Sequence, residues 1–71
     1  MTTQITMISP RRPYTIQVLL WDEKRRRETW QTVETTDRQG DAFLFRDWLQ
    51  KQDFDKVADI YESDFYRKLF G

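Results

Sequence analysis

Carboxylates are the main side chains of this sequence that could take part in catalysis, because histidine and cysteine are both absent. Imidazole acid–base chemistry, thiolate nucleophiles and zinc sites of the Cys/His type therefore lack their essential groups. The two serines, Ser9 and Ser63, have no histidine to activate them. With Gly40 and Gly71 as the only glycines, a glycine-rich phosphate loop cannot be assembled. Paired carboxylates remain, but they fall opposite the apolar stripe of a predicted helix, so we expect no enzyme activity.

Four aspartates in the second half of the sequence are candidate ligands of a calcium-binding loop. An EF-hand loop needs oxygen ligands at positions 1, 3 and 5, glycine at position 6 and an acid at position 12. Counting from Asp53 places Val57 and Ala58 at positions 5 and 6, so the motif fails. We expect neither a metal nor a cofactor site. The four aspartates are Asp53, Asp55, Asp59 and Asp64.

The strongest binding candidate is a basic run between two tryptophans. Arginine makes paired hydrogen bonds to carboxylates, and tryptophan often anchors protein interfaces. We therefore predict a protein partner, contacted through Trp21, Arg25, Arg26, Arg27 and Trp30. The same residue types suit single-stranded nucleic acid, which is the second interpretation, although twelve basic and twelve acidic residues give zero net charge. A solvated turn without any partner is the third interpretation.

Charge is unevenly distributed along the sequence. Residues 10–27 carry six basic and two acidic side chains, a net of +4, whereas residues 53–64 carry one and five, a net of −4. The acidic segment could attract a basic partner, including the basic run of a second copy, so a homo-oligomer is a further possibility. Pro10 and Pro13 match the core of a polyproline ligand, but a loop that interrupts a strand is the preferred interpretation.

Strand-forming patterns fill the first half of the sequence. Residues 3–8 are rich in β-branched side chains and predict a short first strand. Residues 14–21 alternate in polarity and predict the clearest strand. Residues 28–36 regain β-forming composition and predict a third strand. The apolar face of the middle strand contains Tyr14, Ile16, Val18 and Leu20.

The charged run at residues 22–27 predicts a hairpin turn between the second and third strands. A turn near Lys24 places Trp30 opposite Leu19 or Leu20, and the sequence leaves the register open. Because Leu19 and Trp21 are apolar on the second face of the middle strand, we expect both faces to be covered near Trp21.

Helical patterns fill the second half. Residues 36–39 fit a capping box, with Asp41 as an alternative cap. Apolar residues then recur at helical spacing from Ala42 to Leu49, and helix-compatible residues continue to Gln52. A tight turn followed by a strand at residues 42–45 is the competing interpretation. Asp53 is predicted to cap a second helix, whose apolar stripe continues almost to Gly71.

The fold class predicted from this order is α+β. We expect one small two-layer domain over residues 1–71, with a β-rich half at 1–36 and a helical half at 37–71. An antiparallel sheet of about three strands would carry two C-terminal helices on one face. The longest apolar runs, at 18–21 and 42–45, are far shorter than the roughly 20 residues of a membrane span. We therefore expect a cytoplasmic location and no membrane contact.

Overall fold

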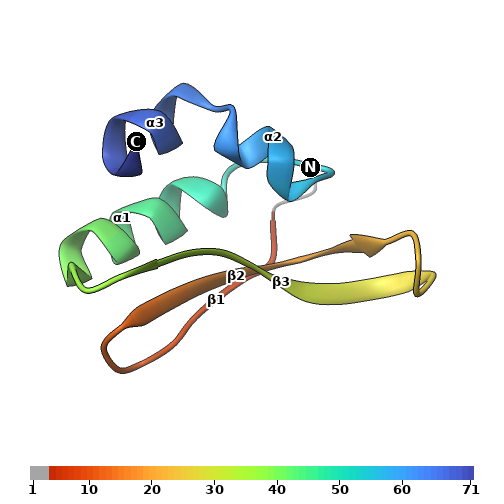
Figure 1. Cartoon of the computed structure of the whole chain (residues 1–71), viewed down its shortest axis with the longest axis horizontal. Helices are drawn as coiled ribbons and strands as arrows, with labels where there is room; N and C mark the ends of the chain where they lie inside the picture. The colour runs from red at the N-terminus through yellow and green to blue at the C-terminus, as the bar shows by residue number, and fades with distance from the viewer. Residues whose placement is uncertain (1–3) are drawn as a thin grey trace.

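The predicted two-layer α+β architecture is confirmed. The computed structural model describes residues 4–71, so the first residue of the predicted strand 3–8 lies outside the described part. The elements are β1 (Thr6–Ile8), β2 (Tyr14–Asp22), β3 (Arg27–Thr36), α1 (Gln39–Leu49), α2 (Val57–Tyr61) and α3 (Asp64–Phe70). The strands form one antiparallel sheet in the order β1-β2-β3, and the helices lie together over one of its faces (Figure 1).

Alternation along β2 decides which face of the sheet meets the helices. Tyr14, Ile16, Val18 and Leu20 are buried, whereas the residues between them are not. Successive side chains of a strand point to opposite faces, so this apolar set forms the floor of the core. β2 and β3 pair as the predicted hairpin, with an irregularity in register between residues 16 and 17.

Helix α1 confirms the helical interpretation and rejects the competing strand at residues 42–45. The predicted capping box at 36–39 is wrong, because the N-cap is Arg38 and no side chain caps the helix. The amide of Arg38 donates to the Thr36 hydroxyl, at 3.2 Å. Asp41 lies inside the first turn rather than at the cap, and its carboxylate accepts from the Arg38 guanidinium at 2.8 Å. The first turn is thus held by this ion pair.

The single helix predicted from Asp53 is divided into α2 and α3. The N-cap of α2 is Lys56, so the predicted cap at Asp53 is wrong. Helix α2 ends two residues before Ser63, whose hydroxyl accepts a hydrogen bond from the amide of Tyr66, at 3.2 Å. A serine at this position satisfies an amide that the first turn leaves free. Ser63 therefore fixes the start of α3 and allows the chain to turn over the sheet.

The core lies between the sheet and the helical layer, with Phe45 of α1 at its centre. Phe45 is fully buried, and its ring lies 5.2 Å from that of Phe70 and 5.9 Å from that of Tyr66, measured between centroids. Trp48 and Phe65 extend this aromatic cluster, stacking at 4.6 Å. Aromatic rings fill a small core with few residues, as their large buried areas allow. Within residues 4–71, no helix has the length and apolar character to cross a membrane.

Candidate functional site

The sheet face opposite the helices carries a row of apolar side chains. Leu19 lies across from Trp30, and the Leu19 amide donates to the Ile5 carbonyl at 2.9 Å, so these three residues cross the sheet side by side. The exposed fraction is 58% for Ile5, 42% for Trp30 and 43% for Met7, which follows Ile5 on the same face of β1. Adding Trp21 completes a set that we call the open face: Ile5, Met7, Leu19, Trp21 and Trp30.

The other half of the same sheet face is polar. Gln17 donates to the Thr32 hydroxyl at 3.2 Å, and the hydroxyls of Thr15 and Thr35 lie 3.3 Å apart. Cross-strand pairs of this kind satisfy their own hydrogen bonds. The apolar half, which is the one next to the hairpin turn, is therefore the part of this face that gains from contact with another apolar surface.

Trp21 corrects an expectation from the sequence. It is 54% exposed, so the prediction that both faces of β2 are covered near this residue is wrong. The last buried residue of β2 is Leu20, and the far end of the hairpin extends beyond the helices (Figure 1). Trp21 lies directly across from Glu28 on β3. Trp21 alternates with buried Leu20 and lies on the sheet face opposite the helices, so the helical layer does not cover it.

The hairpin turn at residues 23–26 is held by Asp22, and we call this turn together with Arg27, the first residue of β3, the hairpin tip. One carboxylate oxygen of Asp22 accepts from the amides of Lys24 and Arg25, at 2.9 and 3.2 Å. The Asp22 carbonyl accepts from the Arg26 amide, at 2.8 Å. Aspartate commonly bonds the backbone amides just beyond it in turns. The basic side chains therefore project from a fixed backbone.

Arg26 adopts a left-handed backbone conformation, with φ of 55°. Side chains other than glycine, asparagine and aspartate seldom adopt it, because Cβ approaches a carbonyl oxygen. Such strain often marks positions where the side chain serves a function. The tip therefore presents an arginine at the position where glycine would fit the backbone best.

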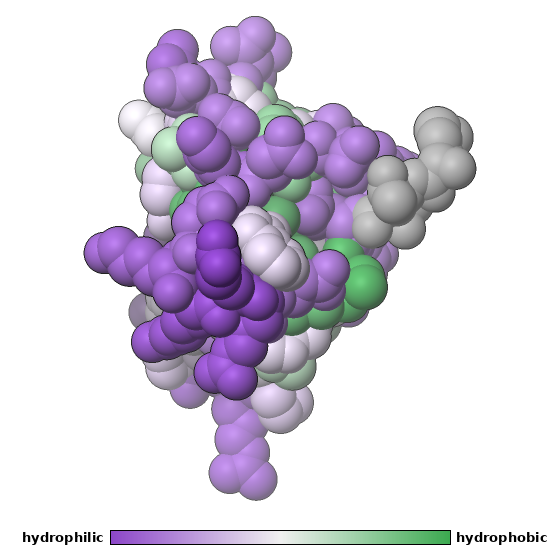
Figure 2. Space-filling model, turned by 90° about the vertical axis from the view of Figure 1, so that its right-hand side faces the viewer, coloured by the Kyte–Doolittle hydropathy of each residue, from purple (hydrophilic) through white to green (hydrophobic). Residues whose placement is uncertain are grey.

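Most of the positive charge of the tip has no partner within the described residues. Arg25 lies 3.9 Å from the Asp22 carboxylate, and Lys24, Arg26 and Arg27 form no ion pair among residues 4–71. All four basic side chains are exposed. Seen end on, hydrophilic side chains gather at the tip, and hydrophobic surface lies beside them (Figure 2).

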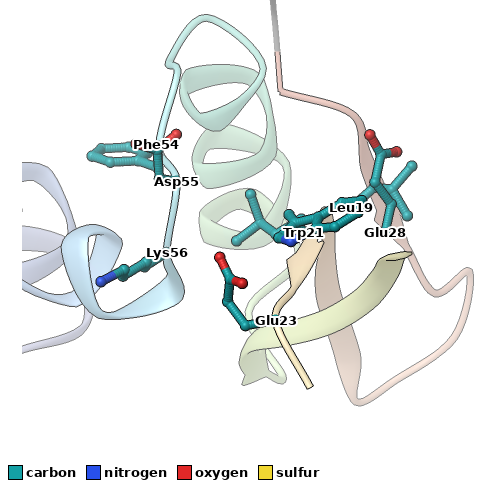
Figure 3. A pocket seen from close by; sticks show the side chains of 8 residues that line it. Leu19, Trp21, Glu23, Glu28, Phe54, Asp55 and Lys56 are labelled. Atoms are coloured by element: carbon teal, nitrogen blue, oxygen red, sulfur yellow. The ribbon is translucent and has the colours of Figure 1, made fainter. Parts of the chain in front are cut away.

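A cavity of about 470 Å³, here called the hairpin pocket, lies between the hairpin and the segment before α2 (Figure 3). The side chain of Gln4 helps to place that segment, because its carbonyl oxygen accepts from the Phe54 amide at 2.7 Å. Gln4 is itself buried. The residues that line the pocket are Leu19, Leu20, Trp21, Glu23, Glu28, Phe54, Asp55 and Lys56.

The character of the pocket is aromatic and acidic. Glu23 reaches into the space between Trp21 and the segment before α2, and Glu28 lies on the other side of Trp21 (Figure 3). Among the described residues, Glu23, Glu28 and Asp55 have no hydrogen-bond or ion-pair partner for their carboxylates. No three acidic groups of residues 4–71 come close enough to hold a metal ion. The pocket therefore offers an indole ring with separate carboxylates around it.

Two lining residues contribute little to that character. The Phe54 ring points away from the pocket and packs on Trp48, with centroids 5.7 Å apart (Figure 3). The side chain of Lys56 also points away (Figure 3). Phe54 thus lines the pocket mainly with its backbone. Because the ammonium group of Lys56 points away, it does not neutralise the three carboxylates.

A second polar cluster joins the helical layer to β3. The Tyr61 hydroxyl donates to the Val33 carbonyl at 2.8 Å, and the Tyr66 hydroxyl donates to the Glu34 carboxylate at 2.7 Å. The hydrogen bond to Glu34, burial and the negative charge raise the pKa of Tyr66 from 10 to about 12. Burial, followed by the charge of Glu34, raises the pKa of Tyr61. Both tyrosines therefore act as neutral donors that fix the two layers.

The five contact residues predicted from the sequence all lie on the β2–β3 hairpin and are exposed. Trp21, Arg25, Arg26 and Arg27 lie at or next to the tip, whereas Trp30 lies farther along β3 on the open face. The sequence interpretation missed Ile5 and Met7 as surface residues. Their alternation along residues 3–8 was visible, but nothing in the sequence told which face the helices would cover.

Comparisons with family models, curated proteins and solved structures found no match for this sequence.

Proposed function

We propose that this chain is a non-enzymatic protein-interaction module, an adaptor or accessory subunit that docks through its β2–β3 hairpin. The observation that supports the proposal is the open face, where two tryptophans and three aliphatic side chains stand on the uncovered side of a sheet. Large apolar side chains gathered on one surface are typical of interaction sites.

The arrangement of apolar and basic residues defines the kind of partner that would fit. The open face would bury an apolar surface, with Trp21 and Trp30 as anchors. The arginines at the adjacent tip would pair with carboxylates at the rim of that surface. The partner is therefore a protein that presents apolar side chains bordered by acidic ones.

A nucleic-acid-associated regulator is the second candidate. Arg26 and Arg27, which form no ion pair within residues 4–71, lie close in sequence to exposed Trp21 and support it, because phosphates pair with arginine and bases stack on indole rings. Glu23 and Glu28 of the hairpin pocket flank the basic run in the sequence and would repel a phosphate backbone. Zero net charge adds to this argument.

Capture from native lysate tests the proposal when wild type is compared with matched variants. The test variant is Ile5→Thr with Trp30→Thr, which keeps β-forming residues in both strands and removes apolar surface. The control is Thr35→Ala on the polar half of the same face. We expect nuclease-resistant protein on wild type and control and its loss on the double variant. Equal capture by all three would contradict the docking site, and material lost on nuclease treatment would favour the second candidate.

A further inference from the structure

The hairpin end of the molecule carries a basic group of side chains and an acidic group of side chains that form no ion pairs with each other among the described residues. The tip presents Lys24, Arg26 and Arg27 without ion-pair partners, and the adjacent pocket presents three free carboxylates, both among the described residues. Glu23 neighbours Lys24 and Glu28 neighbours Arg27 in sequence, yet neither pair forms an ion pair. None of the four basic residues at 24–27 lines the pocket of its own chain.

We propose that the hairpin pocket receives an arginine from the tip of a second copy of this chain. A surface that carries both a basic projection and an acidic recess is complementary to itself. Two copies related by a two-fold axis then place each tip in the other's pocket, so that the contact forms twice. The proposal shares the hairpin tip, Leu19 and Trp21 with the proposed function, but Ile5, Met7 and Trp30 of the open face do not line the pocket.

The chemistry of the pocket suits a guanidinium group. Its planar surface packs against an indole ring, and Trp21 is the exposed ring of the pocket. The Glu23 carboxylate reaches into the space beside that ring and can accept hydrogen bonds from a group that enters there, while Asp55 and Glu28 add negative charge on either side (Figure 3). The tip extends beyond the helical layer (Figure 1), and the pocket opens beside it, between the hairpin and the segment before α2 (Figure 3).

Sedimentation over protein concentrations from about 10 µM to about 1 mM tests the proposal through the oligomeric state. We expect the mass to rise from one chain to two and to stop there, because a two-fold contact is closed. Raising the salt from about 50 mM to about 500 mM should weaken the dimer, because exposed charges are screened. A single-chain mass at every concentration, or growth beyond two chains, would overturn the proposal.

Charge reversal identifies the contacting groups. The tip variant is Arg25→Glu with Arg26→Glu, and the pocket variant is Glu28→Lys with Asp55→Lys. Each alone places like charges together and should weaken the dimer about tenfold or more, whereas an equal mixture restores opposite charges at both contacts. Circular dichroism confirms that each variant is folded. If neither variant weakens the dimer, or if the mixture remains monomeric, the proposal is wrong.

The matched control is Arg11→Glu with Arg12→Glu, which makes the same change in net charge in the loop between β1 and β2. This loop lies at the opposite end of the sheet from the tip (Figure 1). The control should dimerise as wild type does, and loss of its dimer would show that net charge rather than the tip is responsible.

The open-face variant separates this proposal from the proposed function. Ile5→Thr with Trp30→Thr should leave the dimer unchanged while it abolishes partner capture. A dimer lost in this variant and kept in both charge-reversed variants would place the contact on the open face and overturn the pocket assignment. Partner capture unaffected by this variant would contradict the proposed function alone.

Discussion

Replacing Arg26 by glycine should stabilise the monomer while weakening self-association. A left-handed conformation costs an L-residue about 1–2 kcal/mol, which glycine does not incur. Glycine in turn loses about 0.5–1 kcal/mol through the greater freedom of the unfolded chain. The hydrogen bond from the amide of residue 26 to the Asp22 carbonyl involves only backbone atoms and is retained. The expected net effect is a gain in unfolding free energy of about 0–1.5 kcal/mol.

The measurement is urea or thermal unfolding at a protein concentration where the chain is monomeric. For a domain of this size, 1 kcal/mol corresponds to a rise of about 4–8 °C in Tm. Arg25→Gly is the matched control, because Arg26 is the one non-glycine residue with positive φ among the described residues. Arg25→Gly also gives the unfolded chain more freedom, but it relieves no backbone strain. Its unfolding free energy should therefore fall by about 0.5–1 kcal/mol.

The difference between the two variants refutes or supports the argument. If Arg26→Gly is destabilised as much as Arg25→Gly, the backbone at residue 26 is not strained. Sedimentation of the same Arg26→Gly sample then tests the role of the side chain. A more stable monomer that dimerises less well would show that arginine is kept at this position at the expense of stability.

Three further predictions concern the core and the helical layer. Phe45→Ala should cost about 3–5 kcal/mol and unfold much of the protein, as seen by circular dichroism. Ser63→Ala should cost about 1 kcal/mol in urea unfolding, because the amide of Tyr66 loses its partner. Tyr66→Phe should cost about 1.5–3 kcal/mol at neutral pH, because it removes a hydrogen bond to the Glu34 carboxylate. In wild type this contribution is complete below pH 10 and is lost as the pH rises through about 12, because folding raises the Tyr66 pKa. An unfolding free energy of wild type that does not fall between these pH values would contradict the prediction.

Local patterns were sufficient to predict the sheet. Strict alternation in β2 identified the apolar set that became the floor of the core, and the charged run after Trp21 identified the hairpin. These signals are local, because side-chain direction in a strand follows from position alone. The register of Leu19 against Trp30 was one of two predicted values, and strand pairing selected it.

The helical half was harder to predict, because its apolar stripe continues across the turn that separates α2 from α3. Residues 53–71 are compatible with one amphipathic helix, yet the chain turns at Ser63, whose hydroxyl provides an N-cap for α3. Serine bonds nearby backbone equally well in turns and at helix starts, so local sequence does not choose between a continuous helix and a divided one. Packing of Phe65 and Phe70 around Phe45 favours the divided arrangement.

The sequence by itself determined the class of the fold, the hairpin, and the absence of histidine, cysteine and a glycine-rich loop. Tertiary structure alone decided that Leu19, Trp21 and Trp30 face outward, because this depends on which sheet face the helices cover. It also decided that Asp55 lines the same pocket as Glu23 and Glu28. The physical reason is that periodicity defines two faces of a strand, whereas only the packing of distant segments determines which face is buried and which charges become neighbours.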